Sequence, residues 1–208
     1  MNNSEEFDLE NIKVIDDSPL KGKRIAFLGS SITYGVDNIS FVEYIASRNN
    51  CRYLKEAVSG TTLVTSTANS YIERLKKIDP NEKFDIFVCQ LSTNDITQNK
   101  PFGNIGDNDT NTILGAINFI YNYVKEKWNC PFIIYTSAYY DSENYQKLVN
   151  LVKKMNYINL IDMYSDVGFN NITNEQRKLY MLDGVHPTQT GYLEWWTPYI
   201  EKALYKII

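Results

Sequence analysis

The stretch "RIAFLGSSITYG", residues 24–35, decides the predicted fold. Its first half, 24–29, is a short apolar run typical of a buried strand, and its second half is a small polar turn typical of a strand-to-helix connection. Beyond it, short β-rich runs alternate with longer runs of helical period, which indicates βαβ units. The sequence therefore predicts an α/β fold around a mostly parallel sheet.

Five strands and five helices are expected. The predicted strands cover 24–29, 51–58, 84–92, 131–139 and 157–164. The run "FDIFVCQLS" (84–92) is the most apolar of them, so we expect it at the centre of the sheet. The predicted helices cover 40–50, 68–79, 110–128, 142–156 and 188–208. The apolar face of the third helix is expected at Ile113, Ile117, Ile120 and Val124. Ser142 and Thr188 are candidate N-caps, and Pro198 is expected to kink or break the last helix.

The length of 208 residues suits one hydrophobic core. We expect a single domain over 21–208, preceded by an acidic segment, 1–20, that is either a loose leader or an arm lying on the body. Apolar residues make up 43% of the chain and charged residues 22%, which is typical of a soluble globular protein. The N-terminus has neither the regions of a signal peptide nor a membrane-spanning run, so a cytoplasmic location is expected.

The formal charge of −4 comes without a long run of Lys or Arg, so neither nucleic acid nor a membrane is an expected partner. Cys51, Cys89 and Cys130 are odd in number and far apart, which indicates free thiols rather than a disulfide framework. A single histidine and no CxxC pair do not supply the ligands of a zinc site. No metal or other cofactor is expected. The apolar tail "LYKII" (204–208) is a candidate contact of a homo-oligomer.

Four small polar segments follow predicted strands or precede the last helix. They are "GSSITYG" (29–35), "SGTT" (59–62), "STND" (92–95) and "DGVHP" (183–187). In a doubly wound sheet, ligands bind at the carboxyl ends of the strands. We therefore expect these segments to form one site.

The side chains of these segments suit acyl transfer. A serine such as Ser31 becomes a nucleophile when a base takes its proton, and His186 is the only histidine of the chain. Asp183, three residues earlier, can orient the imidazole. The N–H of Gly60 and the side-chain amide of Asn94 can bind a developing oxyanion. The four segments together supply the parts of a serine hydrolase acting on a small-molecule ester.

These segments resemble the four conserved blocks of the SGNH hydrolases, the GDSL-type esterases and lipases. The resemblance implies the flavodoxin-like fold of that family, a three-layer α/β/α sandwich with a five-stranded parallel sheet. It implies three catalytic residues: Ser31 as nucleophile, Asp183 as orienting acid and His186 as base. It implies an oxyanion hole built from Ser31, Gly60 and Asn94. It implies no cofactor.

The resemblance spans residues 24–192 and departs from the family pattern at two positions. Ser30 stands where the name motif of the family has an aspartate, and Ser92 stands where a glycine opens the asparagine block. Neither change removes a reacting group. Both alter the hydrogen bonding expected at the two turns, and the Cβ of Ser92 is expected to narrow the site.

The predicted function is hydrolysis of a small ester with a short acyl or acetyl group. Thioesters and aryl esters are alternative substrates, because the same serine can attack them. The polar segment 96–110 is hypothesised to shape the cleft, which suits a carbohydrate or another polar alcohol. Tyr34 and Gly35 are candidate pocket residues. One alternative is a non-catalytic flavodoxin-like module that binds a phosphate or sugar at "GSSITYG". Another is a family member that has lost catalysis and binds sugars or a partner protein.

Overall fold

The computed structural model describes residues 7–208, and its centre is a five-stranded parallel sheet with strand order β2-β1-β3-β4-β5. The strands are β1 (Arg24–Gly29), β2 (Arg52–Ala57), β3 (Ile86–Gln90), β4 (Phe132–Tyr135) and β5 (Asn159–Ile161). Each pairs in parallel with its neighbour. The predicted α/β fold is confirmed, and β3 lies in the middle of the sheet as its apolar sequence predicted.

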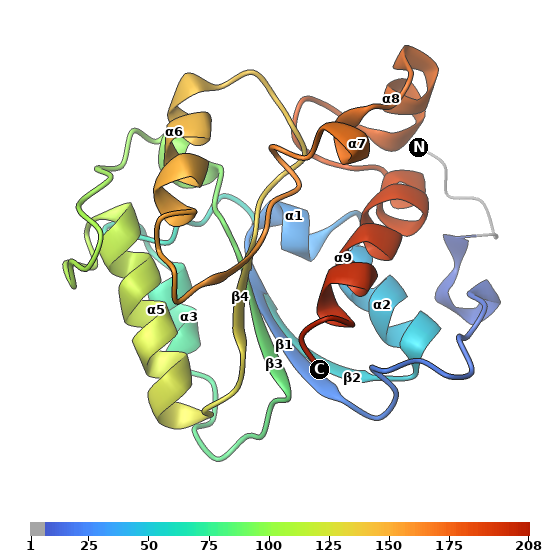
Figure 1. The fold of residues 1–208 in the computed structure, drawn as a ribbon, viewed down its shortest axis with the longest axis horizontal. Helices are drawn as coiled ribbons and strands as arrows, with labels where there is room; N and C mark the ends of the chain where they lie inside the picture. The colour runs from blue at the N-terminus through green and yellow to red at the C-terminus, as the bar shows by residue number, and fades with distance from the viewer. Residues whose placement is uncertain (1–6) are drawn as a thin grey trace.

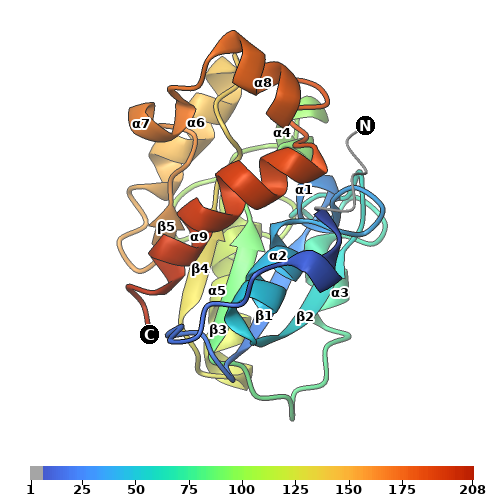
Figure 2. The same ribbon diagram turned by 90° about the vertical axis from the view of Figure 1, so that its right-hand side faces the viewer.

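Helices cover both faces of the sheet (Figure 1). One side carries α3 (Tyr71–Leu75), α5 (Ile113–Lys127) and α6 (Glu143–Val152). The other carries α2 (Phe41–Asn49), the π-helix η3 (Gly191–Trp196) and α9 (Thr197–Leu204). Short helices in the connecting segments are α1 (Ser31–Tyr34), α4 (Asn94–Thr97), α7 (Val167–Asn170) and α8 (Asn174–Tyr180), which gather toward one end of the molecule (Figure 2). The three-layer sandwich is therefore confirmed.

Successive residues of the inner strands face opposite layers. In β1, Ala26 and Leu28 belong to the core beneath α5, whereas Ile25 and Phe27 belong to the core beneath α9. Strands β3 and β4 alternate in the same way. Because side chains point to the two faces of a strand in turn, a strand covered on both faces needs an apolar residue at every position. This requirement explains the continuous apolar runs that marked the strands in the sequence.

The helices form close to the predicted ranges. The four residues predicted for the apolar face of α5 are all buried. Ser142 caps α6 by accepting a hydrogen bond from the Tyr145 N–H, and Thr188 Oγ1 accepts one from the Gly191 N–H at 3.0 Å, so both predicted caps are confirmed. None of the helices in residues 7–208 is both long enough and apolar enough to cross a bilayer.

Of the two effects expected at Pro198, a kink or a break, the break is wrong, and the kink stays a prediction. The helical segment continues through it, and the π-helix η3 passes directly into α9, with the proline in the first turn of α9. Proline lacks the N–H of a regular helical bond but is tolerated at the start of an α-helix. The change of helix type next to Pro198 accommodates the missing donor without ending the helix.

The described part of the N-terminal segment, residues 7–20, lies on α2. Four hydrogen bonds hold it there: Tyr44 OH to Phe7 O at 3.0 Å, Ser47 Oγ to Leu9 O at 3.2 Å, the Ile15 N–H to Arg48 O at 2.6 Å, and Ser18 Oγ to Asn49 Oδ1 at 2.5 Å. A short 3-10 helix, η2 (Leu9–Asn11), forms within it. Residues 1–6 of the expected leader lie outside the described residues. The domain boundaries at 20 and 21 stay a prediction.

Replacing Ile120 by alanine is expected to lower the free energy of unfolding by about 2–5 kcal/mol, because the side chain is fully buried and its removal leaves a cavity. Urea denaturation would show a lower midpoint at an unchanged slope. Asn122 lies on the exposed face of the same helix, so Asn122→Ala is the control, with a change below about 0.5 kcal/mol. Equal losses in the two variants would contradict the assigned core face.

Candidate active site

Ser31 is the first residue of α1, two residues after β1 ends at Gly29. A Cβ added at Gly29 would lie 1.7 Å from Thr33 Oγ1, so only glycine lets the chain turn this tightly into α1. The turn places the Ser31 N–H in the first turn of the helix, where N–H groups have no partner within the helix. The half-buried Ser31 therefore presents a hydroxyl and a backbone donor at the carboxyl edge of the sheet.

The buried side chain of Gln90, the last residue of β3, holds this turn in place. Its Oε1 accepts hydrogen bonds from the Ser30 N–H at 2.9 Å, the Thr33 N–H at 3.3 Å and Thr33 Oγ1 at 2.8 Å. Its Nε2 donates to Ser30 Oγ at 3.1 Å. Ser30, which replaces the aspartate of the family motif, is thus the acceptor for a buried amide.

Asp183 and His186 lie in one tight loop between α8 and η3. Asp183 Oδ1 accepts hydrogen bonds from the N–H groups of Val185 at 2.7 Å and His186 at 2.8 Å, while Oδ2 lies 2.8 Å from His186 Nδ1. His186 Nε2 lies 2.8 Å from Ser31 Oγ, across 155 positions of the chain. The structure therefore brings Ser31, His186 and Asp183 together in one hydrogen-bonded series.

The charge of Asp183 sets the protonation of this series. Partial burial raises the pKa of the Asp183 carboxyl, but the hydrogen bonds from Val185 and His186 outweigh it, and the pKa lies below its ordinary value. An ionised carboxylate accepts the proton carried on His186 Nδ1. His186 Nε2 is then the acceptor for the Ser31 hydroxyl, so the imidazole can take the serine proton.

Gly60 lies on the loop after β2, and Asn94 is the first residue of α4. Asn94 Nδ2 donates to Thr61 O at 2.9 Å, next to Gly60 in the chain. Gly60 has a φ of +78°, a left-handed conformation that strains other residues, and it is exposed. The Asn94 amide carries a second N–H besides the one given to Thr61. The structure thus places Asn94 in contact with the residue that follows Gly60, at the same edge of the sheet as Ser31.

Asp95, a residue that the sequence analysis did not single out, anchors the loop that carries Gly60. This buried carboxylate accepts hydrogen bonds from the Leu63 N–H at 2.8 Å and the Val64 N–H at 3.3 Å. Burial raises its pKa despite these bonds. Ser92 Oγ accepts the Asp95 N–H at 3.3 Å and is itself fully buried, so the Ser92 side chain supports α4 rather than an exposed surface.

The polar segment 96–110 reaches the loop of Gly60. Gln98 Nε2 donates to Gly60 O at 3.2 Å, and Lys100 Nζ donates to Ser66 Oγ at 3.1 Å. The exposed ring of Tyr34 lies with its centre 5.8 Å from Lys55 Nζ. The segment 96–110 thus borders the predicted site. The ring of Tyr34 contacts Lys55, a residue of β2.

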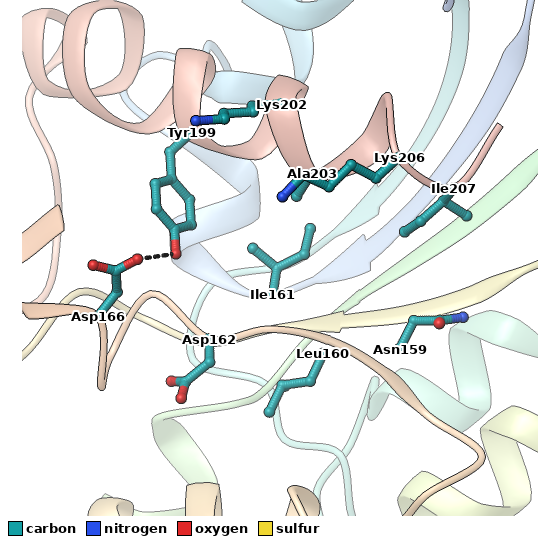
Figure 3. A pocket seen from close by; sticks show the side chains of 10 residues that line it. All are labelled: Asn159, Leu160, Ile161, Asp162, Asp166, Tyr199, Lys202, Ala203, Lys206 and Ile207. Carbon is teal, nitrogen blue, oxygen red and sulfur yellow. Dashed lines mark hydrogen bonds between the residues drawn. The ribbon is translucent and has the colours of Figure 1, made fainter. Parts of the chain in front are cut away.

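The series of Ser31, His186 and Asp183 lies at an open surface, since the side chain of His186 is 36% exposed and that of Asp183 is 53% exposed. A cavity of about 440 Å³ lies elsewhere, between β5 and α9, where Tyr199 donates a hydrogen bond to Asp166 (Figure 3). None of the three residues lines that cavity. Within residues 7–208, no group of three or more His, Cys, Asp or Glu side chains is placed to hold a metal ion.

A serine, a histidine and an aspartate joined in this order at the edge of a sheet are the arrangement of serine hydrolases. The chain belongs to the GDSL-like lipase/acylhydrolase family, whose model matches residues 27–193. The predicted membership of the SGNH hydrolase superfamily is confirmed, and the protein is a carboxylic ester hydrolase. No curated protein matches the chain by sequence.

Solved structures share the fold at low sequence identity. A protein from Bacteroides ovatus described as a GDSL-like lipase is 17% identical, with a TM-score of 0.66 over 89% of this chain and 99% of its own. An active-site mutant of a family two carbohydrate esterase from Clostridium thermocellum is 13% identical, with a TM-score of 0.61 over 89% and 65% of the two chains. A protein from Agrobacterium tumefaciens described as an arylesterase is 15% identical, with a TM-score of 0.59 over 89% and 100%.

The variant Gln90→Leu is expected to lower both stability and ester turnover, because it leaves the N–H groups of Ser30 and Thr33, in the turn around Ser31, without their acceptor. Each such group costs about 1–3 kcal/mol when unpaired. Urea denaturation would measure the loss, and hydrolysis of p-nitrophenyl acetate would measure turnover. Gln146→Leu on α6, where the side chain bonds Asn150, is the control and is expected to change neither. Wild-type turnover in Gln90→Leu would show that the turn does not depend on this side chain.

Proposed function

We propose that the protein is a serine esterase that hydrolyses small esters with a short acyl or acetyl group. The observation that carries the proposal is the continuous hydrogen-bonded series from Ser31 Oγ through His186 to Asp183. In this series the base lies within hydrogen-bonding distance of the nucleophile, and the carboxylate lies within the same distance of the base. These are the two contacts that activation of a serine requires.

In the first half of the reaction, Ser31 Oγ attacks the ester carbonyl carbon while His186 Nε2 takes the hydroxyl proton. The carbonyl π-bond opens and its electrons go to the carbonyl oxygen, which becomes an oxyanion. When the tetrahedral intermediate collapses, the bond to the alcohol oxygen breaks and His186 returns the proton to the leaving alcohol. Asp183, whose pKa lies below its ordinary value, stays ionised and stabilises the imidazolium.

In the second half, a water molecule attacks the acyl-serine and gives a proton to His186 Nε2. Collapse of the second tetrahedral intermediate breaks the bond to Ser31 Oγ, and the proton returns to the serine. The products are the free acid and the regenerated enzyme. The open surface at His186 supports this step, since solvent reaches the imidazole.

The oxyanion of both intermediates would be held by the N–H groups of Ser31 and Gly60 and by the side-chain amide of Asn94. Donors fixed before the reaction stabilise the developing charge without rearrangement, and one such donor contributes about 10²–10³ in kcat. The support in this chain is the bond from Asn94 to Thr61 O and the anchoring of the same loop by Asp95.

A polar alcohol portion, such as a carbohydrate, is the proposed leaving group. The supporting features are the exposure of the site and the polar rim, where Gln98 contacts the Gly60 loop. A structural neighbour of this chain is an active-site mutant of a family two carbohydrate esterase. Proposed partners are thus confined to small-molecule esters, with neither nucleic acid nor membrane among them.

The alternative of a non-catalytic phosphate- or sugar-binding module rests on the turn at 29–35 alone. It gives no role to the bond between Ser31 and His186 or to the neighbouring position of Gly60 and Asn94. Phosphate binding without ester hydrolysis would favour it.

The variant Ser31→Ala is expected to hydrolyse p-nitrophenyl acetate more slowly than the wild type by a factor of about 10⁴ or more, because the nucleophile is removed. A series of p-nitrophenyl esters from acetate to long chains, assayed on wild type and variant, would also give the acyl preference, with acetate and other short chains expected to be fastest. Ser142→Ala, which removes a helix cap on α6, is the control and should retain turnover. Turnover that survives in Ser31→Ala would remove Ser31 from the mechanism.

Acidification is expected to lower kcat/KM, because the base must be neutral to accept the serine proton. Asp183 is not the source of this loss, because its pKa lies below its ordinary value and it stays ionised over the tested range. A plot of log(kcat/KM) against pH should therefore show a single acid limb with a slope of one. The check is kcat/KM for the acetate ester between about pH 5 and 8, the range in which histidines titrate. A flat profile would argue against His186 as the base.

A further inference from the structure

A buried cation lies between the turn that precedes Ser31 and the loop of Gly60. Arg74, on α3, is 4% exposed. Its Nη2 donates to Gly29 O at 2.8 Å and to Thr61 Oγ1 at 3.2 Å, and its Nη1 donates to Glu56 O. No carboxylate in the described part of the chain forms an ion pair with it. Its positive charge is instead satisfied by the ends of two strands, by the loop of Thr61 and by Asn69 O, which accepts a hydrogen bond from Arg74 Nε at 3.0 Å.

The chemistry of these bonds requires a guanidinium. Burying a charge is unfavourable unless hydrogen bonds replace the lost water, so a buried arginine must keep its donors occupied. Arginine has five N–H donors in a rigid planar fork, whereas lysine has a single ammonium at the end of a flexible chain. Gly29 O and Thr61 Oγ1 bond one terminal nitrogen of the guanidinium, and Glu56 O bonds the other. A single ammonium cannot serve all three at the observed positions.

Two of the four acceptors, Gly29 O and Thr61 Oγ1, belong to the segments that carry the proposed reaction. Gly29 precedes Ser31 by two residues at the end of β1. Thr61 follows Gly60, and its carbonyl oxygen accepts the hydrogen bond from Asn94 Nδ2 at 2.9 Å. Thr61 Oγ1 donates its own proton to Val58 O at 2.6 Å, so it is an acceptor toward Arg74. Arg74 is therefore linked to the nucleophile on one side and to two oxyanion donors on the other.

We propose that Arg74 is a positioning residue, which fixes the Ser31 turn relative to the oxyanion donors Gly60 and Asn94. The proposal rests on the serine esterase function proposed above. Arg74 is buried and acts through Gly29 and Thr61 rather than on the substrate. Loss of Arg74 shifts the oxyanion donors away from the place where charge develops. The contacts that bind the ester in the ground state remain. The effect falls on kcat and not on KM.

The test compares Arg74→Lys with Arg48→Lys, a matched change at a second arginine. Arg48 is bonded to Glu201 between α2 and α9, and lysine can keep that ion pair. We expect Arg74→Lys to lower kcat by about 10–100-fold with KM nearly unchanged, since small displacements of catalytic groups have effects of this size. The affinity of a small alkylboronic acid, which forms a tetrahedral adduct with an active serine, should fall by a similar factor. Arg48→Lys should change none of these values.

A loss that appears in KM, or equal effects in the two variants, would overturn the proposal. If Arg74→Lys is poorly folded at the assay temperature, the same comparison is made at a lower temperature, where both variants give the native circular dichroism spectrum.

Amide hydrogen exchange separates this proposal from the esterase proposal. In Arg74→Lys, exchange should increase at 29–33 and 57–64, whereas in Arg48→Lys it should not. If the wild type hydrolyses no ester but this local increase is seen, the esterase function fails and the role of Arg74 in fixing the two segments stands. If exchange at 29–33 and 57–64 is unchanged, the role of Arg74 is refuted whatever the activity.

Discussion

The parallel direction of the strands is the constraint on which the site depends. Residue pairing places Gly29 beside Ala57 and Leu28 beside Cys89, so β1, β2 and β3 all end at one edge of the sheet. At that edge the chain must leave each strand through a turn, and ligands of doubly wound folds bind there. The small polar residues that follow these three strands, far apart in the sequence, therefore lie together, and Ser31, Gly60 and Asn94 come from three different crossovers.

Three buried polar side chains then fix the turns relative to one another. Gln90 bonds the turn at Ser30, Asp95 bonds the loop after Gly60, and Arg74 bonds both. A buried donor or acceptor that loses its partner costs more than a hydrogen bond normally contributes, so each side chain restricts its loop to one arrangement. Oxyanion donors act best when they are fixed before the reaction, and these buried groups would give that rigidity to the proposed donors.

The histidine loop is held in a different way, by the packing of the last helices. Within the loop, Asp183 bonds two N–H groups that follow it and the ring of His186, so the acid and base are arranged by near neighbours in the chain. The distance to Ser31 is set from outside the loop. Tyr192 OH donates to Ile32 O at 2.9 Å, and this bond joins η3 to α1, the helix that begins at Ser31. Deformation of that helix contact would separate the base from the serine without changing the loop itself.

The sequence by itself determined the five strands, the central place of β3, the buried face of α5 and the four segments of the site, because apolar periodicity and short motifs are local signals. The only sign of the role of Gln90 in the sequence was the position of a polar side chain at the end of the most apolar strand. The tertiary structure decided the roles of Gln90, Arg74 and Asp95, the passage of the last helix through Pro198, and the open setting of His186. Each of these depends on which backbone groups from distant segments meet a side chain, and that is set by packing rather than by spacing along the chain.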